Sequence, residues 1–249
     1  MRRIAISLSV CLLAASLAAR AAVKTQDVTL PSGGESIAAY LAVPEGAGKH
    51  PAVVVVHEWW GLTDWVKEQT RNLAGQGYVA LAVDLYRGQV AYDPSLAYEL
   101  AHSMPEDRAV GDLKAAFDFL AARADVNKDK IGAVGWCMGG SLALQLAENE
   151  PHLAACVVYY GTLPTDAAML QKIQAPLLGN FGADDRNIPP AAVEAFESAM
   201  KDAKKSVDIK IYRGAGHAFA NPNNKLGYQE DAAADAWKRT LAFLAHLLK

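Results

Sequence analysis

The sequence is poor in cysteine, lacks runs of like charge and has no long apolar segment after residue 20. Three of the 249 residues are cysteine and no C-x-x-C pair occurs, which argues against a thioredoxin-like redox motif. The 24 basic and 27 acidic residues are interspersed, so no basic patch for nucleic acid is visible. Later apolar runs fall short of the roughly 20 residues of a transmembrane helix. We therefore expect neither nucleic-acid binding nor stable membrane association of the mature chain.

The first residues have the composition of a secretory signal peptide. Two arginines precede an apolar stretch, and small residues follow it around Ala21 and Ala22. A membrane anchor is the alternative, but the apolar core is short for one. We predict a signal peptide over residues 1–21, cleavage near Ala21 or Ala22, and a periplasmic or secreted product. Cleavage removes three arginines and no acidic residue, so the formal net charge changes from −3 to −6.

The remaining residues, 22–249, are predicted to form one α/β domain. The chain is 52% hydrophobic, which suits one sizeable core. Short β-branched runs alternate with amphipathic stretches, a pattern typical of a mostly parallel sheet of about seven or eight strands with helices on both faces. No insertion is long enough for a separate lid domain. The predicted strands are 36–43, 52–57, 78–86, 130–136, 154–161, 175–182 and 207–214, and the predicted helices are 64–77, 107–124, 139–149, 191–201 and 231–248.

The pentapeptide "GWCMG" (135–139) has the G-x-nucleophile-x-G spacing of a strained turn between a strand and a helix. Cys137 occupies the nucleophile position, where serine is more common. The flanking glycines, Gly135 and Gly139, permit the close backbone approach that such a turn requires. A helix beginning at this point favours a thiolate through its dipole. A purely structural turn is the alternative interpretation.

Two further strand ends carry residues that complete a catalytic set. "FGADDRNIP" (181–189) places Asp184 and Asp185 after one strand, and "YRGAGHAF" (212–219) places His217 after the next. Nucleophile, acid and histidine thus follow the chain order of the α/β-hydrolase triad. His217 would accept the thiol proton, and an aspartate would hold its imidazole in the required tautomer. Asp185 is our choice for that aspartate, whereas Asp184 also suits a turn.

The stretch "HEWWG" (57–61) follows an early strand, at the place that supplies an oxyanion-hole N–H in such folds. We predict that the backbone amides of Trp59 and Met138 form the oxyanion hole. The pair His57–Glu58 does not complete an H-E-x-x-H zinc motif, because Gly61 stands where the second histidine is required. No metal or cofactor is therefore expected. Trp59 and its neighbour Trp60 suit either the core or the pocket.

The motifs together resemble the dienelactone hydrolase family, whose members use cysteine on the α/β-hydrolase fold. "HEWWGL", "YVALAVDLY", "GWCMGG", "FGADDRNIP" and "AGHAFAN" carry the resemblance over nearly all of the mature chain. It implies a Cys137–His217–Asp185 triad, with Glu58 beside the thiol as the group that takes its proton once substrate arrives. Seven pocket residues are also expected: Trp60, Tyr86, Arg87, Tyr159, Tyr160, Phe219 and Asn221.

The sequence departs from this family at its substrate-carboxylate clamp. Arg87 lies one place earlier than the first arginine of the family, and Asn221 stands in place of the second. The resemblance thus implies a small activated ester or lactone as substrate without fixing an acidic one. We predict an exported monomeric hydrolase that forms an acyl-thioester on Cys137. A redox or sensor protein pairing Cys137 with Cys156, and a non-catalytic binding protein, are the alternatives.

Overall fold

The computed structural model describes residues 22–249, so the predicted signal peptide lies outside the described residues. These residues form an eight-stranded sheet in the order β1-β2-β4-β3-β5-β6-β7-β8. The strands are β1 (Val23–Ser32), β2 (Glu35–Pro44), β3 (His50–Val56), β4 (Val79–Val83), β5 (Val126–Trp136), β6 (Ala155–Tyr159), β7 (Leu177–Gly182) and β8 (Val207–Tyr212). The helices are α1 (Asp64–Gly75), α2 (Pro94–Ser103), α3 (Glu106–Ala122), α4 (Met138–Asn149), α5 (Ala167–Lys172), α6 (Pro190–Asp202) and α7 (Glu230–Leu248).

The six strands β3 to β8 run parallel, while β1 and β2 add an antiparallel hairpin at one edge. This confirms the predicted mostly parallel α/β-hydrolase sheet. The continuous valine run of β3 is explained by burial on both faces. Val54 and Val56 pack into one hydrophobic cluster, whereas Val53 and Val55 pack into another on the opposite face.

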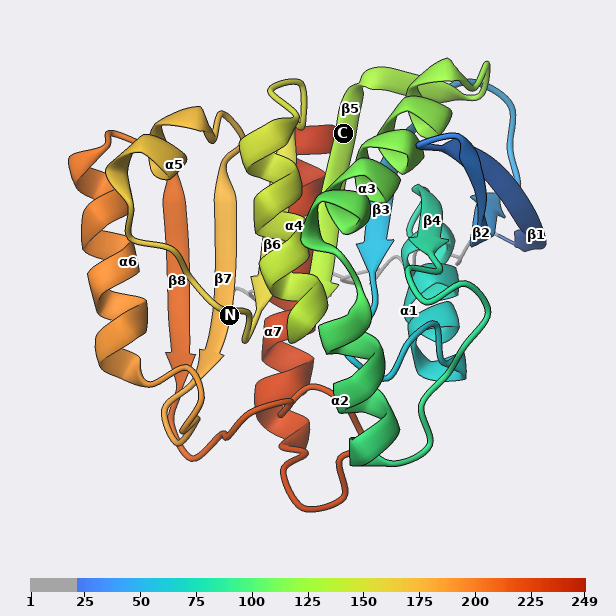
Figure 1. The fold of residues 1–249 in the computed structure, drawn as a ribbon. Helices are drawn as coiled ribbons and strands as arrows, with labels where there is room; N and C mark the ends of the chain where they lie inside the picture. Colours follow the sequence, from blue (N-terminus) through green and yellow to red (C-terminus); the bar gives the residue numbers. More distant parts are fainter. Residues whose placement is uncertain (1–21) are drawn as a thin grey trace, which may run out of the picture.

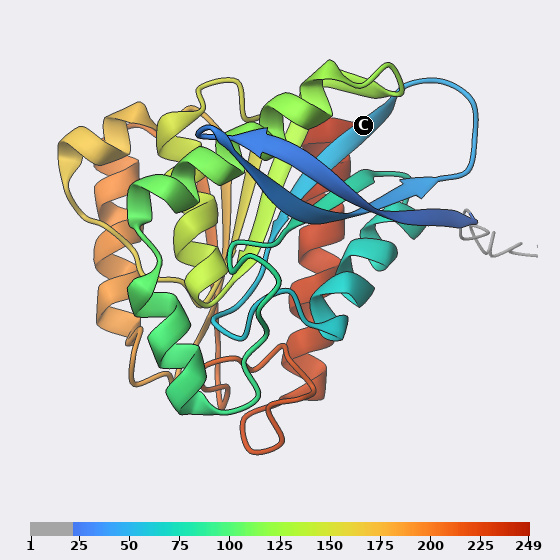
Figure 2. The ribbon, with the colours of Figure 1, turned by 45° about the vertical axis from the view of Figure 1, so that its right-hand side comes forward.

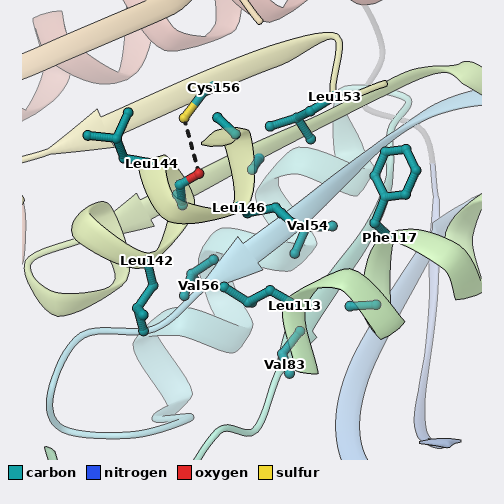
Figure 3. Packing of buried hydrophobic residues seen from close by; sticks show 14 of the residues in the cluster. Val54, Val56, Val83, Leu113, Phe117, Leu142, Leu144, Leu146, Leu153 and Cys156 are labelled. Carbon is teal, nitrogen blue, oxygen red and sulfur yellow. Dashed lines mark hydrogen bonds between the residues drawn. The ribbon is translucent and has the colours of Figure 1, made fainter. Parts of the chain in front are cut away.

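Helices cover both faces of the sheet (Figures 1 and 2). Buried residues of α2, α3, α4, α5 and α6 belong to the same cluster as Val54, while those of α1 and α7 belong to the cluster of Val53. Figure 3 shows the first cluster, in which Leu113 and Phe117 of α3 and Leu142 of α4 lie against the central strands. No separate lid domain is present in residues 22–249.

Three elements were not predicted from the sequence. Strand β1 is exposed at most of its positions, so it lacks the apolar pattern of a buried strand. Helix α2 and the six-residue helix α5 were also missed. For α2 a local signal exists, because the side chain of Asp93 caps the helix and Pro94 begins it. The predicted strand 78–86 ends earlier than expected, at Val83, because Asp84 begins a turn.

Candidate active site

Cys137 lies in the strained turn that its flanking glycines predicted. Its backbone has φ 55° and ψ −121°, in a region that a non-glycine residue rarely adopts. A side chain at Gly135 would collide with the carbonyl of Gly139, and one at Gly139 would collide with the carbonyls of Val56 and His57. Because both positions exclude a Cβ atom, the turn brings the start of α4 directly against the end of β3.

The turn places the thiol next to His217, and His217 next to Asp185. His217 Nε2 lies 3.1 Å from Cys137 Sγ, and His217 Nδ1 lies 2.8 Å from Asp185 Oδ2. In the tautomer that carries hydrogen on Nδ1, the ring donates to Asp185 and leaves Nε2 free to accept the thiol proton. The three residues come from loops after β5, β7 and β8, which meet at the carboxyl edge of the sheet.

Asp185, rather than Asp184, contacts the histidine. Its side chain is fully buried, and its other oxygen, Oδ1, accepts hydrogen bonds from the backbone amides of Asn187 and Ile188. Burial acts to raise the pKa of Asp185, but the hydrogen bond and charge of His217 and these two amides outweigh it, so the pKa is lowered. Asp185 therefore stays ionised and keeps the imidazole oriented. Asp184 is exposed.

His217 is held in an environment that favours its protonated form. Burial acts to lower its pKa, yet hydrogen bonds to Asp185 and Cys137, and electrostatic interactions with the same two side chains, raise the pKa to about 10. The side chain remains 27% exposed, so the ring is accessible from the cleft. Tyr160 packs edge-on against it with 5.2 Å between ring centroids. The imidazole can thus receive a proton and hold it beside the sulfur.

Glu58 lies close to this set but bonds to residues other than the thiol. Its carboxyl accepts hydrogen bonds from Asn221 Nδ2 at 2.6 Å and from the Tyr160 hydroxyl at 3.3 Å. Burial raises the pKa of Glu58 to about 7, although Asn221, the charge of His217 and Tyr160 act to lower it. Within residues 22–249 no hydrogen bond joins Glu58 to Cys137, whose hydrogen-bonding partner is His217. The expected position beside the thiol is therefore refined: Glu58 faces Asn221.

The geometry around Trp59 and Met138 suits an oxyanion hole. Met138 is the first residue of α4, so its amide has no acceptor within the helix. The Trp59 amide has no hydrogen-bonding partner among the described residues. Gly139 packs against the carbonyls of Val56 and His57, which brings the two loops together. The ring of His57 is buried. Its Nδ1 hydrogen-bonds to the Glu58 carbonyl and its Nε2 accepts a hydrogen bond from the Leu85 amide, so His57 has a structural role.

A cleft of about 750 Å³ opens onto Cys137 and His217. Trp59 and Trp60 line it and also pack against the hydrophobic cluster of Val54, so both of their alternative assignments apply. Asn221 also lines the cleft. The other lining residues are Thr63, Ala91, Asn187, Ala218, Asn223, Asn224, Lys225 and Leu226, and none of them was predicted.

Five of the expected pocket residues do not line the cleft: Tyr86, Arg87, Tyr159, Tyr160 and Phe219. Arg87 forms ion pairs with Asp112 and Glu35, so it is not available to a substrate carboxylate. Tyr86 is buried, and its hydroxyl donates a hydrogen bond to the sulfur of Met138. Tyr159 and Phe219 are also buried, the first bonded to Thr240 and the second packed on Tyr160.

Tyr160, although fully buried, contributes indirectly through Glu58 and His217. The missed asparagine-rich stretch 221–227 has a local signal, since "NPNN" is rich in turn-forming residues. The position of this segment at the cleft depends on long-range packing, which a local turn-forming pattern does not predict.

Both cysteines of the described residues are free thiols. Cys156 lies on β6 with no exposed surface, and its sulfur faces the carbonyl of Ala143 on α4 at 3.5 Å (Figure 3). Burial raises the pKa of Cys156 to about 12, which keeps this thiol protonated. Such a buried thiol is a poor partner for exchange with Cys137. Within residues 22–249 no cluster of three or more His, Cys, Asp or Glu side chains is arranged to hold a metal ion.

Comparison with known sequences identifies the family of this chain. A sequence model of the "Dienelactone hydrolase family" matches residues 37–248. A "Putative carboxymethylenebutenolidase" of Saccharolobus solfataricus is 32% identical, with 90% of this chain and 99% of that protein covered. A "Probable 2-oxo-3-(5-oxofuran-2-ylidene)propanoate lactonase" of Bradyrhizobium sp. is 33% identical, with 87% of this chain and 92% of that protein covered.

Solved structures agree with the sequence comparison. The crystal structure of a "Putative Dienelactone Hydrolase" from Klebsiella pneumoniae superposes with a TM-score of 0.83 at 32% sequence identity. The match covers 90% of this chain and 99% of the Klebsiella chain. The similarity in fold and sequence therefore extends over whole chains. The protein belongs to the dienelactone hydrolase family and is a hydrolase.

Proposed function

We propose that the protein hydrolyses small activated carboxylic esters or lactones through an acyl-thioester on Cys137. The observation that carries the proposal is the hydrogen-bonded series from Cys137 Sγ through His217 to Asp185, at 3.1 Å and 2.8 Å, on the wall of an open cleft. A nucleophile, a base and a group that orients the base are the three parts that covalent acyl transfer requires.

The acylation step uses these groups in order. The thiol proton passes to His217 Nε2, where the raised pKa of the ring favours holding it, and Sγ attacks the carbonyl carbon, which forms a carbon–sulfur bond and an oxyanion. The amides of Trp59 and Met138 donate hydrogen bonds to that oxyanion. The intermediate then expels the alkoxide, and the His217 imidazolium returns its proton to the leaving oxygen. For a lactone, that oxygen stays attached to the acyl chain.

Deacylation reverses the roles, with water as the nucleophile. His217 accepts a proton from water, whose oxygen attacks the thioester carbon, and the carbon–sulfur bond breaks to release the carboxylic acid. The proton returns to sulfur. Glu58, with its pKa near 7, is a second group able to hold a proton in this site. We propose that it governs the protonation of Cys137 through His217, since the charge of His217 acts on the Glu58 carboxyl.

The substrate class follows from the nucleophile and the cleft. A thiolate attacks carbonyls well but is also readily expelled, so acyl groups with good leaving groups, such as enol lactones and aryl esters, suit it best. The volume of about 750 Å³ lies in the usual range for small-molecule sites. With Arg87 paired to Asp112 and an asparagine at 221, the two-arginine clamp for a substrate carboxylate is absent from the described residues.

A rapid-mixing assay with p-nitrophenyl acetate tests the proposal. Wild type is expected to release about one nitrophenolate per thiol in a burst, because acylation precedes slower hydrolysis of the thioester. Mass spectrometry after an acid quench should find the acetyl group on the peptide that contains Cys137. Cys137→Ala should show neither burst nor adduct, and Cys156→Ala should show both. An unchanged rate in Cys137→Ala would refute the mechanism.

We further propose that the protein is exported and acts as a monomer in the periplasm or outside the cell. The basic, apolar and small-residue segments before Ala22 support export. Strand β1 begins at Val23, so cleavage near Ala21 or Ala22 would leave the sheet whole. No helix in residues 22–249 combines the length and apolarity needed to cross a bilayer. Mass measurement of the exported protein should give an amino terminus at Ala22 or Val23, and light scattering should give the mass of one chain.

A further inference from the structure

A second pocket, of about 310 Å³, lies on the α1 and α7 side of the sheet. We call it the rear pocket. Five aromatic residues contribute to its lining: Trp65, Trp136, Tyr159, Tyr228 and Trp237. Two carboxylates, Glu68 and Glu230, also line it, and its lining contains no lysine, arginine or histidine. Trp65, Trp136 and Tyr159 are buried, so the aromatic surface open to the pocket comes from Tyr228 and Trp237. The pocket therefore combines aromatic surface with negative charge, and the hydrolase mechanism uses none of these side chains.

Helical spacing explains how this lining is assembled. Trp65 and Glu68 are three residues apart on α1, and Glu230 and Trp237 are seven apart on α7, so each pair shares one helix face. The two helices cover the same face of the sheet (Figure 2). Beneath them, Trp136 packs edge-on against Trp65, with 5.3 Å between ring centroids. The rings of the lining thus support one another.

Several residues that line the rear pocket are adjacent in sequence to residues of the active site. Trp136 directly precedes Cys137, and Tyr159 directly precedes Tyr160. Ala220, which also lines the rear pocket, directly precedes Asn221 of the cleft. The linings of the two cavities are therefore adjacent along the backbone at residues 136–137 and 220–221.

The charges of the rear pocket indicate what it can bind. Neither Glu68 nor Glu230 forms an ion pair among the described residues, so neither carboxylate is neutralised by a neighbouring lysine or arginine there. Aromatic faces attract cations through their quadrupole, and unpaired carboxylates add to this attraction. We propose that the rear pocket binds a small organic cation of the quaternary ammonium type, with its alkyl groups against Trp237 and Tyr228, the two lining rings that keep exposed surface, and its charge toward Glu68 and Glu230. This binding does not depend on the reaction at Cys137.

Choline and its neutral isostere 3,3-dimethylbutanol are suitable probes, because they have the same shape and differ in charge. Calorimetric titration of the full chain is expected to show saturable binding of choline, at least about tenfold tighter than binding of the isostere. The double variant Glu68→Gln/Glu230→Gln should weaken choline binding about tenfold while leaving binding of the isostere unchanged. Both residues are exposed, so these changes leave the core intact.

Two controls locate the bound cation. Glu194→Gln, an exposed change on α6, should leave choline affinity as in wild type. Alkylation of Cys137 with iodoacetamide occupies the cleft and should also leave it unchanged. The proposal is overturned by absence of saturable choline binding, by equal affinity for choline and the isostere, by an undiminished affinity in the double variant, or by loss of binding on alkylation. None of these results bears on ester hydrolysis, which the burst assay measures separately.

Discussion

Asn221 of the cleft wall donates a 2.6 Å hydrogen bond to the buried carboxyl of Glu58. The resemblance noted in the sequence implies an arginine at this place, where this chain has asparagine. A neutral amide stabilises a carboxylate less than a guanidinium does, because it supplies a dipole in place of a full charge. Burial therefore prevails, and the pKa of Glu58 stays raised, at about 7. The substitution thus leaves Glu58 able to change protonation near neutral pH.

The first prediction concerns how Glu58 affects the reactivity of Cys137. Glu58→Gln should lower turnover of p-nitrophenyl acetate and remove an ionisation near pH 7 from the pH profile of Cys137 alkylation by iodoacetamide. The reason is that glutamine can still accept from Asn221 with its oxygen and can donate from its amide nitrogen to the Tyr160 oxygen, but it cannot gain or lose a proton. The control is Glu99→Gln, an exposed change on α2 that should leave both measurements as in wild type. Identical profiles in Glu58→Gln and wild type would assign Glu58 a structural role only.

The second prediction concerns stability. Burial raises the pKa of Glu58 from 4.5 to about 7, so the native state binds a proton that the unfolded state releases above pH 4.5. The contribution of Glu58 to the free energy of unfolding therefore falls as pH rises from 4.5 and is fully lost above 7. A change of this size corresponds to at most about 3 kcal/mol. Urea titrations at pH 5 and pH 8 should show a smaller fall in stability for Glu58→Gln than for wild type; an equal fall would contradict the assignment.

The third prediction separates the two neighbouring aspartates. Asp185→Asn should lower kcat for p-nitrophenyl acetate by about 10³- to 10⁴-fold, because the amide no longer fixes the Nδ1–H tautomer of His217. Asp184→Asn is the matched control, since Asp184 is exposed and only Asp185 bonds to His217. It should retain wild-type kcat. A similar loss in both variants would indicate general disruption of the loop in place of a specific orienting role.

Most of the strands, their mostly parallel arrangement and the residues at their ends could be predicted from the sequence. The strands with continuous β-branched or apolar runs were found because burial on both faces demands such runs. Strand β1 was missed because an exposed edge strand needs no apolar face. Cys137, Asp185 and His217 were found because a triad depends on loops that all follow parallel strands.

The surroundings of the triad could not be predicted in the same way. Glu58 meets Tyr160 and Asn221 across 102 and 163 residues of sequence, so no local pattern reports either contact. Arg87 was expected in the pocket because of its position after "DLY", but its guanidinium pairs with Asp112 of α3. The direction in which a long side chain points depends on the partner that packing supplies. The sequence alone does not determine which of several possible partners such a side chain contacts.

The fourth prediction tests the close packing of the nucleophile turn. Gly139→Ala should lower the free energy of unfolding by about 2 kcal/mol or more, because the added methyl group would collide with the carbonyls of Val56 and His57. It should also reduce the burst with p-nitrophenyl acetate, since relief of the collision moves the start of α4 away from the Trp59 loop. Gly111→Ala is the control: Gly111 lies on α3 with no atom within 4 Å of an added Cβ, so alanine there should stabilise the helix by about 0.5–1 kcal/mol. Urea titration of wild type and the two variants measures both changes in the free energy of unfolding. A Gly139→Ala protein as stable as wild type would show that the turn tolerates a side chain.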